Sequence, residues 1–167
     1  AEALEVAHRV RTVAFDKTGT LTEGHPSFER AVAVPGTAED EVLRLAASLD
    51  QGSEHPLADA IVRAARERGL VLEKAEQFES ETGIGVRGTV GGKRLALGNG
   101  ALMAQDGGDV GALAKDAESL RQNGASVMHL AADGHILGLL IVSDPIKAST
   151  QEALTVLRQA GLRIVMA

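Results

Sequence analysis

The chain has 167 residues, 44% of them hydrophobic, and a formal net charge of -6. The negative charge argues against a protein that binds the nucleic-acid backbone, and an aromatic content of 2% argues against base-stacking surfaces for single strands. Without cysteine, the chain has no disulfides and no thiolate metal ligands. Its longest apolar run, residues 136–142, is too short to cross a bilayer.

The first part of the chain predicts a buried strand, an extended segment and two helices. Thr37 and Asp40 resemble a capping box that opens the first helix. Pro56 stands at a favoured first helical position, and Gly69 stops the second helix. In chain order, the expected elements are a strand at 10–15, an extended segment at 26–34 and helices at 37–49 and 56–69.

The second part predicts two hairpins, two helices and a final strand. Gly91-Gly92 and Asp133-Gly134 are two-residue hairpin turns between apolar, alternating segments. Ser149 opens the last helix as the first residue of a second capping box. The expected elements are strands at 86–90, 93–97, 126–132 and 135–142, helices at 111–123 and 149–161, and a strand at 162–166.

The order of these elements predicts an α/β protein with an inserted unit. The first and last strands look like pieces of one parallel sheet, since the chain ends in a helix followed by a buried strand. Between them lies a segment that reads as an antiparallel α+β unit. Because no turn follows the last strand, we expect the parallel sheet to be incomplete in this chain.

Asp16 is the first candidate for chemistry. It follows a buried strand, the place where open α/β sheets hold their reactive groups. An isolated carboxylate can attack phosphorus, and Lys17 and Thr18 could then hold the phosphoryl oxygens. A Mg²⁺ ion bound by Asp16 would neutralise the developing charge. A lone strand-end aspartate more often only starts a turn, but that reading leaves the string DKTGTLT unexplained.

The string at 16–22 resembles the phosphorylation motif of P-type ATPases, which are haloacid-dehalogenase-like ion pumps. Phosphatases of that superfamily carry a second aspartate two residues after the nucleophile as general acid and base, and this chain has Thr18 there. The resemblance therefore implies a phosphoenzyme that persists long enough to drive a conformational step. A soluble haloacid-dehalogenase-like phosphohydrolase, or a non-catalytic nucleotide-sensing module, remains the alternative.

Residues 53–57, Ser-Glu-His-Pro-Leu, resemble a motif in the nucleotide-binding domain of heavy-metal P-type ATPases. The resemblance implies that His55 packs near the adenine of ATP, and Glu54 belongs to the same motif. Some relatives have a glutamate five residues before this histidine. This chain has Asp50 there, which is one methylene shorter, and the resemblance implies an adenine contact from it.

The stretch 83–88 spells GxGxxG, but no βαβ unit surrounds it, so a dinucleotide site is rejected. In the resembled pumps a Gly-x-Gly here lets backbone amides approach ATP, and a Gly-Asn pair closes the pocket. Where some relatives have an arginine next, this chain has Gly100. The implied nucleotide-binding residues are Asp50, Glu54, His55, Gly83, Ile84, Gly85, Val86, Gly98 and Asn99, with Ile84 and Val86 as walls of the adenine slot.

Residues 144–147, Asp-Pro-Ile-Lys, read on physical grounds as a turn before a helix. They resemble the hinge of copper-exporting pumps, with Asp144 and Pro145 at its start. Zinc, cadmium and lead pumps more often have another string there, so monovalent copper is favoured and those metals stay open. The resemblance implies ATP and Mg²⁺ as cofactors, with Asp16 as a magnesium ligand and the other ligands outside this chain.

The resemblance implies three segments: 1–27 as the start of a phosphorylation domain, 28–142 as a nucleotide-binding domain, and 143–167 as the hinge and the returning part of the phosphorylation domain. It implies the cytoplasmic portion of a membrane protein, with actuator and membrane domains and a transported metal ion as partners in the whole pump. The chain itself is expected to bind ATP without autophosphorylating competently. His8, His25, His129 and His135 show no metal-site spacing, and we expect surface or turn positions.

Overall fold

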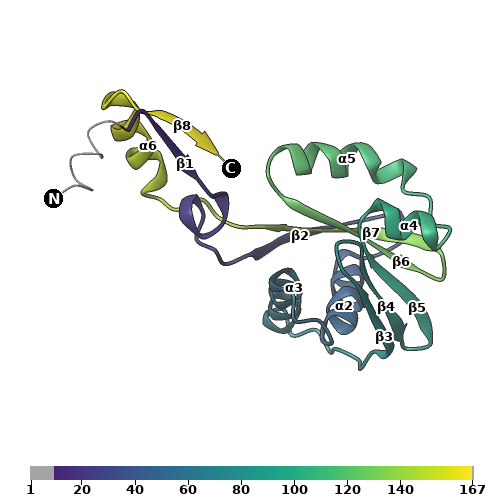
Figure 1. Cartoon of the computed structure of the whole chain (residues 1–167). Helices are drawn as coiled ribbons and strands as arrows, with labels where there is room; N and C mark the ends of the chain where they lie inside the picture. The colour runs from purple at the N-terminus through teal and green to yellow at the C-terminus, as the bar shows by residue number, and fades with distance from the viewer. Residues whose placement is uncertain (1–9, 167) are drawn as a thin grey trace. The chain divides into compact units, whose positions relative to one another are not determined.

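The structure, a computed structural model, describes residues 10–166 apart from the side chains of Lys17 and Ala112. Its contacts fall into two compact units, shown in Figure 1. We call residues 26–143 the large unit, and the described residues of 10–25 together with 144–166 the small unit. No helix in the described range is long and apolar enough to cross a membrane.

The large unit is built on a six-stranded antiparallel sheet with the strand order β2-β7-β6-β5-β4-β3. From β3 to β7, strands that follow one another in the chain are neighbours in the sheet, and β2 pairs with β7 at the other edge. Short turns join β3 to β4, β4 to β5 and β6 to β7, whereas residues 99–125, which include two helices, connect β5 to β6. The antiparallel sheet expected from the sequence is thus confirmed. Its strands are β2 (Ser27–Ala33), β3 (Glu76–Glu81), β4 (Gly85–Val90), β5 (Lys93–Gly98), β6 (Ser126–Ala132) and β7 (His135–Ser143).

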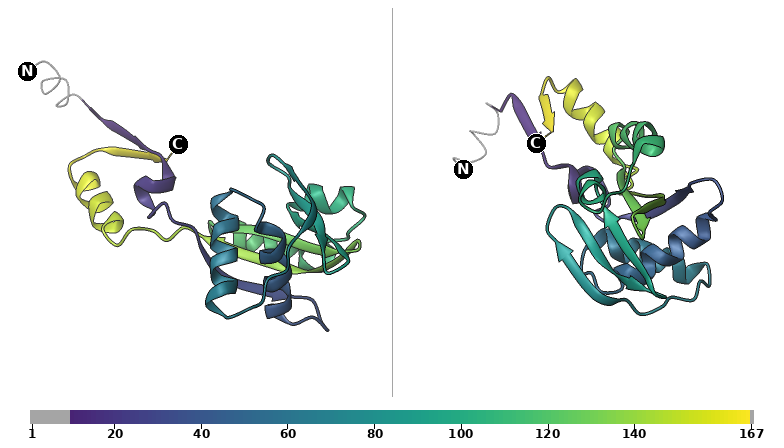
Figure 2. Two further views of the ribbon diagram at one scale, coloured as in Figure 1. Left: turned by 90° about the horizontal axis from the view of Figure 1, so that it is seen from below. Right: turned by 90° about the vertical axis from the view of Figure 1, so that its right-hand side faces the viewer.

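Helices cover both faces of this sheet, as Figure 2 shows from two sides. Alternate residues of a strand point to opposite faces. Accordingly Leu130 packs in the core beneath α2 (Glu39–Asp50) and α3 (Pro56–Glu67), while its neighbour Ala131 packs with α4 (Gly100–Gln105). The second helix on that face, α5 (Gly111–Gln122), packs through Leu113.

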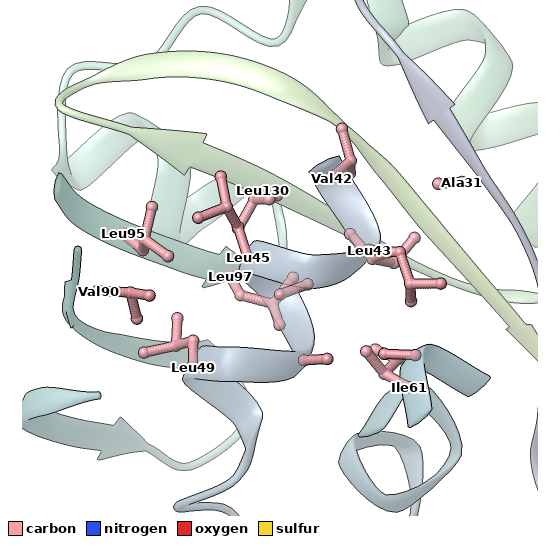
Figure 3. Close-up of a cluster of buried hydrophobic side chains, with 14 of the residues drawn as sticks. Ala31, Val42, Leu43, Leu45, Leu49, Ile61, Val90, Leu95, Leu97 and Leu130 are labelled. Atoms are coloured by element: carbon pink, nitrogen blue, oxygen red, sulfur yellow. The ribbon is translucent and has the colours of Figure 1, made fainter. Parts of the chain in front are cut away.

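The main core lies between α2 and the sheet. Leu43, Leu45 and Leu49 of α2 are at most 1% exposed. Leu45 and Leu49 lie on one side of the helix and Leu43 on the other, as their spacing requires. Figure 3 shows Leu45 and Leu49 on the side of Leu95 and Leu97 of β5, and Leu43 on the side of Ala31 and Ile61. All these side chains are aliphatic, as the low aromatic content of the sequence requires.

Both predicted hairpin turns are confirmed. Gly91 and Gly92 join β4 to β5 with φ angles of 57° and 79°. Asp133 and Gly134 join β6 to β7 with φ angles of 51° and 82°. Positive φ at both central residues is the geometry that matches the twist of the flanking strands.

The small unit contains a two-stranded parallel sheet of β1 (Thr12–Phe15) and β8 (Arg163–Met166). Residue Thr12 is paired with Arg163 and Phe15 with Met166. The expected parallel pairing of the first and last strands is therefore confirmed. The helix α6 (Thr150–Gln159) precedes β8 and contacts it.

Some local expectations were wrong. The helix α2 begins after Ala38, which makes no side-chain cap, so Thr37 opens no capping box. Ser149 likewise makes no side-chain cap for α6. The next residue explains this: the Thr150 hydroxyl donates to the Leu21 carbonyl at 2.7 Å, so the start of α6 is fixed by a tertiary contact within the small unit.

Among the histidines, His129 corrects another expectation. It is only 2% exposed and lies in the middle of β6, opposite Gly98 of β5. Neither ring nitrogen has a hydrogen-bond partner among the described residues. Burial lowers the pKa of His129, and the positive charge of the nearby Arg121 lowers it further.

Candidate functional site

A cavity of about 400 Å³ lies within the large unit, at the end of the sheet where β4 begins and β5 ends. It is formed by the end of α2, the start of α3 and the neighbouring ends of β3, β4, β5 and β6. Of the nine predicted nucleotide-binding residues, Glu54 alone is outside its lining. The predicted residues that line it are Asp50, His55, Gly83, Ile84, Gly85, Val86, Gly98 and Asn99.

Sequence reasoning missed the rest of the wall. Most of the additional residues are apolar or carry a short hydroxyl side chain. Ser53 and Leu57 belong to the motif at 53–57 but were not singled out in it, and the others come from segments without a motif. The β6 contribution could have been found only from the register of β6 against β5, which places the start of β6 beside the end of β5. The additional lining residues are Ser53, Leu57, Ala58, Ser80, Glu81, Thr82, Leu97, Val127 and Met128.

Two glycines face each other where β4 and β5 meet. Gly85 is paired with Gly98, and a β-carbon on Gly98 would lie 2.3 Å from the Ile84 carbonyl oxygen and 2.9 Å from the Gly85 α-carbon. A β-carbon on Gly85 would lie 2.3 Å from the Leu97 carbonyl oxygen. Both positions therefore require glycine because the strands approach too closely for a side chain.

Asn99 links α4 to the loop at the cavity mouth. Its Oδ1 accepts hydrogen bonds from the backbone N–H groups of Ala101 and Leu102, which caps α4. Its Nδ2 donates to the Gly83 carbonyl at 2.9 Å. The Asn99 side chain thus fixes the position of the Gly83 loop relative to β5, a role that acts through the loop backbone.

His55 is the N-terminal cap of α3. Its Nδ1 accepts the backbone N–H of Leu57 at 3.1 Å, and Pro56 follows as the first helical residue. Since Nδ1 acts as the acceptor, the neutral ring carries its proton on Nε2. The rest of the ring is exposed and available on the cavity wall.

Asp50 is the last residue of α2 and is only 5% exposed. Its carboxyl group has no hydrogen-bond partner among the described residues, and no lysine or arginine lines the cavity beside it. Burial raises the pKa of Asp50 to about 7, because a desolvated carboxylate is disfavoured. The negative end of the helix dipole acts in the same direction.

A larger hollow of about 880 Å³ lies on the large unit away from the predicted residues. Both arginines of its lining already face carboxylates: Arg87 is bound by Asp106 at 3.1 Å and by Gln105 at 2.5 Å, and Arg94 Nε lies 3.8 Å from Asp133 Oδ1. The positive charges of this hollow are therefore compensated within the protein. The smaller cavity is therefore the better candidate for a ligand site.

In the small unit, Asp16 is exposed directly after β1. The turn that follows, η1 (Lys17–Leu21), has non-helical backbone angles at Thr18 and Gly19. The left-handed φ of 75° at Gly19 is the conformation that favours glycine. The Lys17 side chain lies outside the described residues, so its predicted contact with a phosphoryl group stays a prediction.

The return segment holds this turn in place. Thr22 is 1% exposed, and its hydroxyl accepts the Gly19 N–H at 3.1 Å and donates to Asp144 Oδ2 at 2.5 Å. The other carboxylate oxygen of Asp144 accepts the backbone N–H groups of Gly24 and His25 at 3.0 and 3.2 Å. The sequence indicated Asp144 as a hinge residue but gave no sign of Thr22 as its partner.

Two further contacts complete the anchorage. The Pro145 carbonyl accepts the Glu23 N–H at 2.8 Å. The Lys147 ammonium donates to the Gly19 carbonyl at 2.6 Å. The turn after Asp16 is therefore shaped by residues more than 120 positions away in the chain.

Comparison with known proteins shows the family. The model for haloacid dehalogenase-like hydrolases matches residues 10–167. The chain belongs to this family. Among its relatives, a copper-exporting P-type ATPase of Legionella pneumophila is 53% identical over 99% of this chain and 22% of its own length. A silver-exporting P-type ATPase of Salmonella typhimurium is 43% identical over 99% of this chain and 20% of its own length.

A solved structure agrees with these relatives. The crystal structure of a zinc-transporting PIB-type ATPase is 33% identical, has a TM-score of 0.76 and covers 94% of this chain. This chain covers 25% of that structure and about a fifth of the length of the two curated relatives. The chain therefore shares its fold with part of a zinc-transporting PIB-type ATPase.

In this haloacid dehalogenase-like chain, the fit to Mg²⁺ is partial. Asp16 offers one exposed carboxylate, and no cluster of three or more histidines or acidic residues is present in the described part of the chain. Mg²⁺ often keeps several waters and takes one or two carboxylates together with substrate phosphates. Asp16 suits such an ion as one ligand, with phosphate oxygens and water as others.

Proposed function

We propose that this chain is the ATP-binding and aspartyl-phosphorylation portion of a copper(I)-transporting P-type ATPase. The observation that carries the proposal is the convergence of His55, the Gly83–Gly85 loop and the Gly98-Asn99 pair on one cavity of the large unit. These groups come from three separate stretches of sequence. In this proposal, residues 28–142 form the nucleotide-binding domain, and residues 1–27 and 143–167 belong to the phosphorylation domain.

The cavity suits an adenine base. Ile84, Val86 and Met128 provide apolar walls, and small-molecule sites are usually apolar with a few placed polar groups. The absence of lysine and arginine from the lining argues that the cavity holds the base, and that the triphosphate extends away from it. A γ-phosphate left outside the cavity is available for transfer.

Transfer would use Asp16 of the small unit. A carboxylate oxygen of Asp16 forms a bond to the γ-phosphorus while the bond from that phosphorus to the ADP oxygen breaks, and ADP leaves. Mg²⁺, when bound, supplies neutralisation of the phosphate charge. Thr18, two residues later, is exposed, and its hydroxyl cannot act as the general base that would activate a water molecule. The aspartyl phosphate would therefore persist.

Copper is the finer part of the proposal. The Asp144-Pro-Ile-Lys147 string and the identity to the Legionella pneumophila relative support it. Silver and zinc are alternatives because a silver-exporting relative and the solved structure of a zinc-transporting ATPase also match this chain. Cadmium and lead are the other metals that the 144–147 string leaves open. The whole pump would place this portion in the cytoplasm, with the actuator domain, the membrane domain and the transported ion as its partners.

A soluble phosphohydrolase that uses the large unit as a substrate cap is the second candidate. The family match is compatible with it. However, Thr18 stands where such an enzyme needs its acid, and a cap would not require the His55 and Gly83–Gly85 arrangement. The observations favour the pump.

The test is a titration of ATP into the chain and into His55→Gln, followed by amide chemical shifts with and without Mg²⁺. We expect saturable shifts at His55, Gly83, Gly85 and Gly98 that are weakened in the variant. Shifts confined to Asp16 and its turn would support the phosphohydrolase. No shifts at either place would overturn the proposal.

A further inference from the structure

We infer that Asp50 recognises the adenine base as a neutral carboxylic acid, so that nucleotide affinity depends on a proton held at the end of α2. This inference rests on the proposed function, since it concerns the same cavity. It adds the chemical form of the carboxyl group and a regulation by pH, neither of which follows from the motifs.

The geometry isolates this carboxyl group. Asp50 is 5% exposed, lines the cavity and has no hydrogen-bond partner among the described residues. Its main-chain carbonyl accepts the Ser53 N–H at 3.0 Å, so the backbone there is fixed while the side chain remains unpaired. The carboxyl oxygens are not sealed inside the protein, since the fully buried unpaired side-chain atoms among the described residues are those of His129. They open onto the cavity, where a ligand group can replace water as their partner.

The charges around Asp50 do not favour its ionised form. From the start of α3, His55 faces the same cavity, and from the end of β3, Glu81 does. The strands β4, β5 and β6 contribute no titratable side chain to the lining, and α2 itself contributes only Asp50. Burial therefore dominates and raises the pKa of Asp50 to about 7.

The neutral acid fits the Watson–Crick edge of adenine. That edge offers an acceptor at N1 and a donor at the N6 amino group. A protonated carboxyl group has one O–H donor and one carbonyl acceptor, so it can make both hydrogen bonds at once. An ionised carboxylate has acceptors only. It can accept a hydrogen bond from the N6 amino group, but its other oxygen would face the N1 acceptor, and the two lone pairs would repel each other.

The consequence is a loss of affinity as the pH rises. The neutral form predominates below a pKa of about 7, so the affinity for ATP should fall about tenfold between pH 6 and pH 8. By linkage, ATP should in turn raise the pKa of Asp50, because binding favours the protonated form. An ionised Asp50 that bound adenine would give the opposite dependence.

The experiment compares wild type with Asp50→Asn and Asp50→Ala between pH 6 and pH 8 by calorimetric titration with ATP. Asparagine offers the same donor and acceptor without a titrating proton, so this variant should bind ATP more tightly than wild type at pH 8. Asp50→Ala should bind weakly at both pH values. The three proteins differ only at residue 50, so a difference between them in how the affinity for ATP changes with pH isolates the contribution of Asp50.

A second probe is 1-deaza-ATP, in which a C–H group replaces N1. We expect it to bind wild type about tenfold more weakly than ATP at pH 6, with a smaller difference at pH 8. If the variants are poorly folded, the pKa of Asp50 can be measured in wild type from the ¹³C shift of its carboxyl group, with and without ATP. A rise in the pKa of Asp50 on ATP binding supports the inference.

The outcomes separate the two proposals. If wild type binds no adenine nucleotide at any pH, the proposed function fails. If wild type binds ATP but with the same pH dependence as Asp50→Asn, or if ATP leaves the Asp50 pKa unchanged or lowers it, only the inference about the proton is overturned.

Discussion

Thr22 and Asp144 are joined by a 2.5 Å hydrogen bond between the threonine hydroxyl and carboxylate oxygen Oδ2, although 122 positions separate them in the chain. The same hydroxyl accepts the Gly19 N–H. Asp144 therefore acts, through Thr22, on the backbone of the turn that follows Asp16. A residue read from the sequence as part of a hinge helps to shape the proposed phosphorylation turn.

Thr22→Val should loosen this turn. The substitution keeps the shape of a buried side chain but leaves the Gly19 N–H without the threonine acceptor and Asp144 Oδ2 without the threonine donor. We expect a loss of about 1–3 kcal/mol of local stability, measured as faster amide hydrogen exchange over residues 17–25. Thr20→Val is the matched control, since Thr20 is exposed. Equal effects of the two substitutions would contradict the role of Thr22.

At His55, two variants separate helix capping from ligand binding. His55→Asn keeps a side-chain acceptor for the Leu57 N–H, whereas His55→Ala removes it at a cost of about 1 kcal/mol in unfolding free energy. If the imidazole ring packs on adenine, both should bind ATP about tenfold or more weakly. Denaturant unfolding and calorimetry measure the two effects. Wild-type affinity in His55→Asn would show that only the cap matters.

Gly98→Ala should distort the cavity mouth. The new β-carbon would lie 2.3 Å from the Ile84 carbonyl oxygen, so β4 and β5 must move apart. We expect about 1–3 kcal/mol of destabilisation together with weakened ATP binding. Gly100→Ala is the control, because nothing lies within 4 Å of its β-carbon and alanine suits the start of α4. A Gly98→Ala protein with wild-type stability would refute the close approach of the strands.

Without any nucleotide, Asp50 should make the large unit less stable at neutral pH than in mild acid. Its pKa is raised by burial from 3.8 to about 7 in the folded state, so the folded state binds the proton more tightly than the unfolded state. The stability that this proton supplies is present below about pH 4 and is lost as the pH rises to 7. The loss is at most about 4 kcal/mol.

Asp50→Asn removes this titration, so the variant should gain stability relative to wild type between pH 5 and pH 8. Urea unfolding at the two pH values measures the difference. Asp59→Asn, on the exposed side of α3, is a suitable control with no such gain. A constant difference between wild type and Asp50→Asn across this range would argue that Asp50 is ionised throughout.

His129 has the opposite dependence. Burial, and then the charge of Arg121, lower its pKa from 6.5 in the folded state. Its contribution to stability is therefore lost as the pH falls below the unfolded value. His129→Leu should unfold at higher urea concentration than wild type at pH 5, with a smaller gain at pH 7. The exposed His135, changed to Gln, should show no comparable gain.

The sequence predicted those parts of the fold whose signals are local. The Gly91-Gly92 and Asp133-Gly134 turns fix both hairpins, and α3 begins at Pro56 as expected. The parallel pairing of β1 with β8 followed from the order of elements alone. Motif resemblance then brought distant residues to one cavity before any geometry was known.

The failures lie where tertiary contacts override local chemistry. Thr37 and Ser149 have the residue types of helix caps, but neither caps a helix. The edge strand β3 is mostly exposed and acidic, so it has no alternating apolar pattern to reveal it. The burial of His129 and the bond from Thr22 to Asp144 depend on strand register and on long-range contacts, which one sequence does not encode visibly.

The large unit begins and ends on paired strands, since Ser27 of β2 lies opposite Ser143 of β7. Both ends lie at the same end of the β2–β7 pair, so tension applied to them would break the hydrogen bonds between β2 and β7 one after another. Just outside that first pair, Asp144 binds Gly24 and His25 across the two connecting segments. These hydrogen bonds of Asp144 would have to break before the tension reached the sheet.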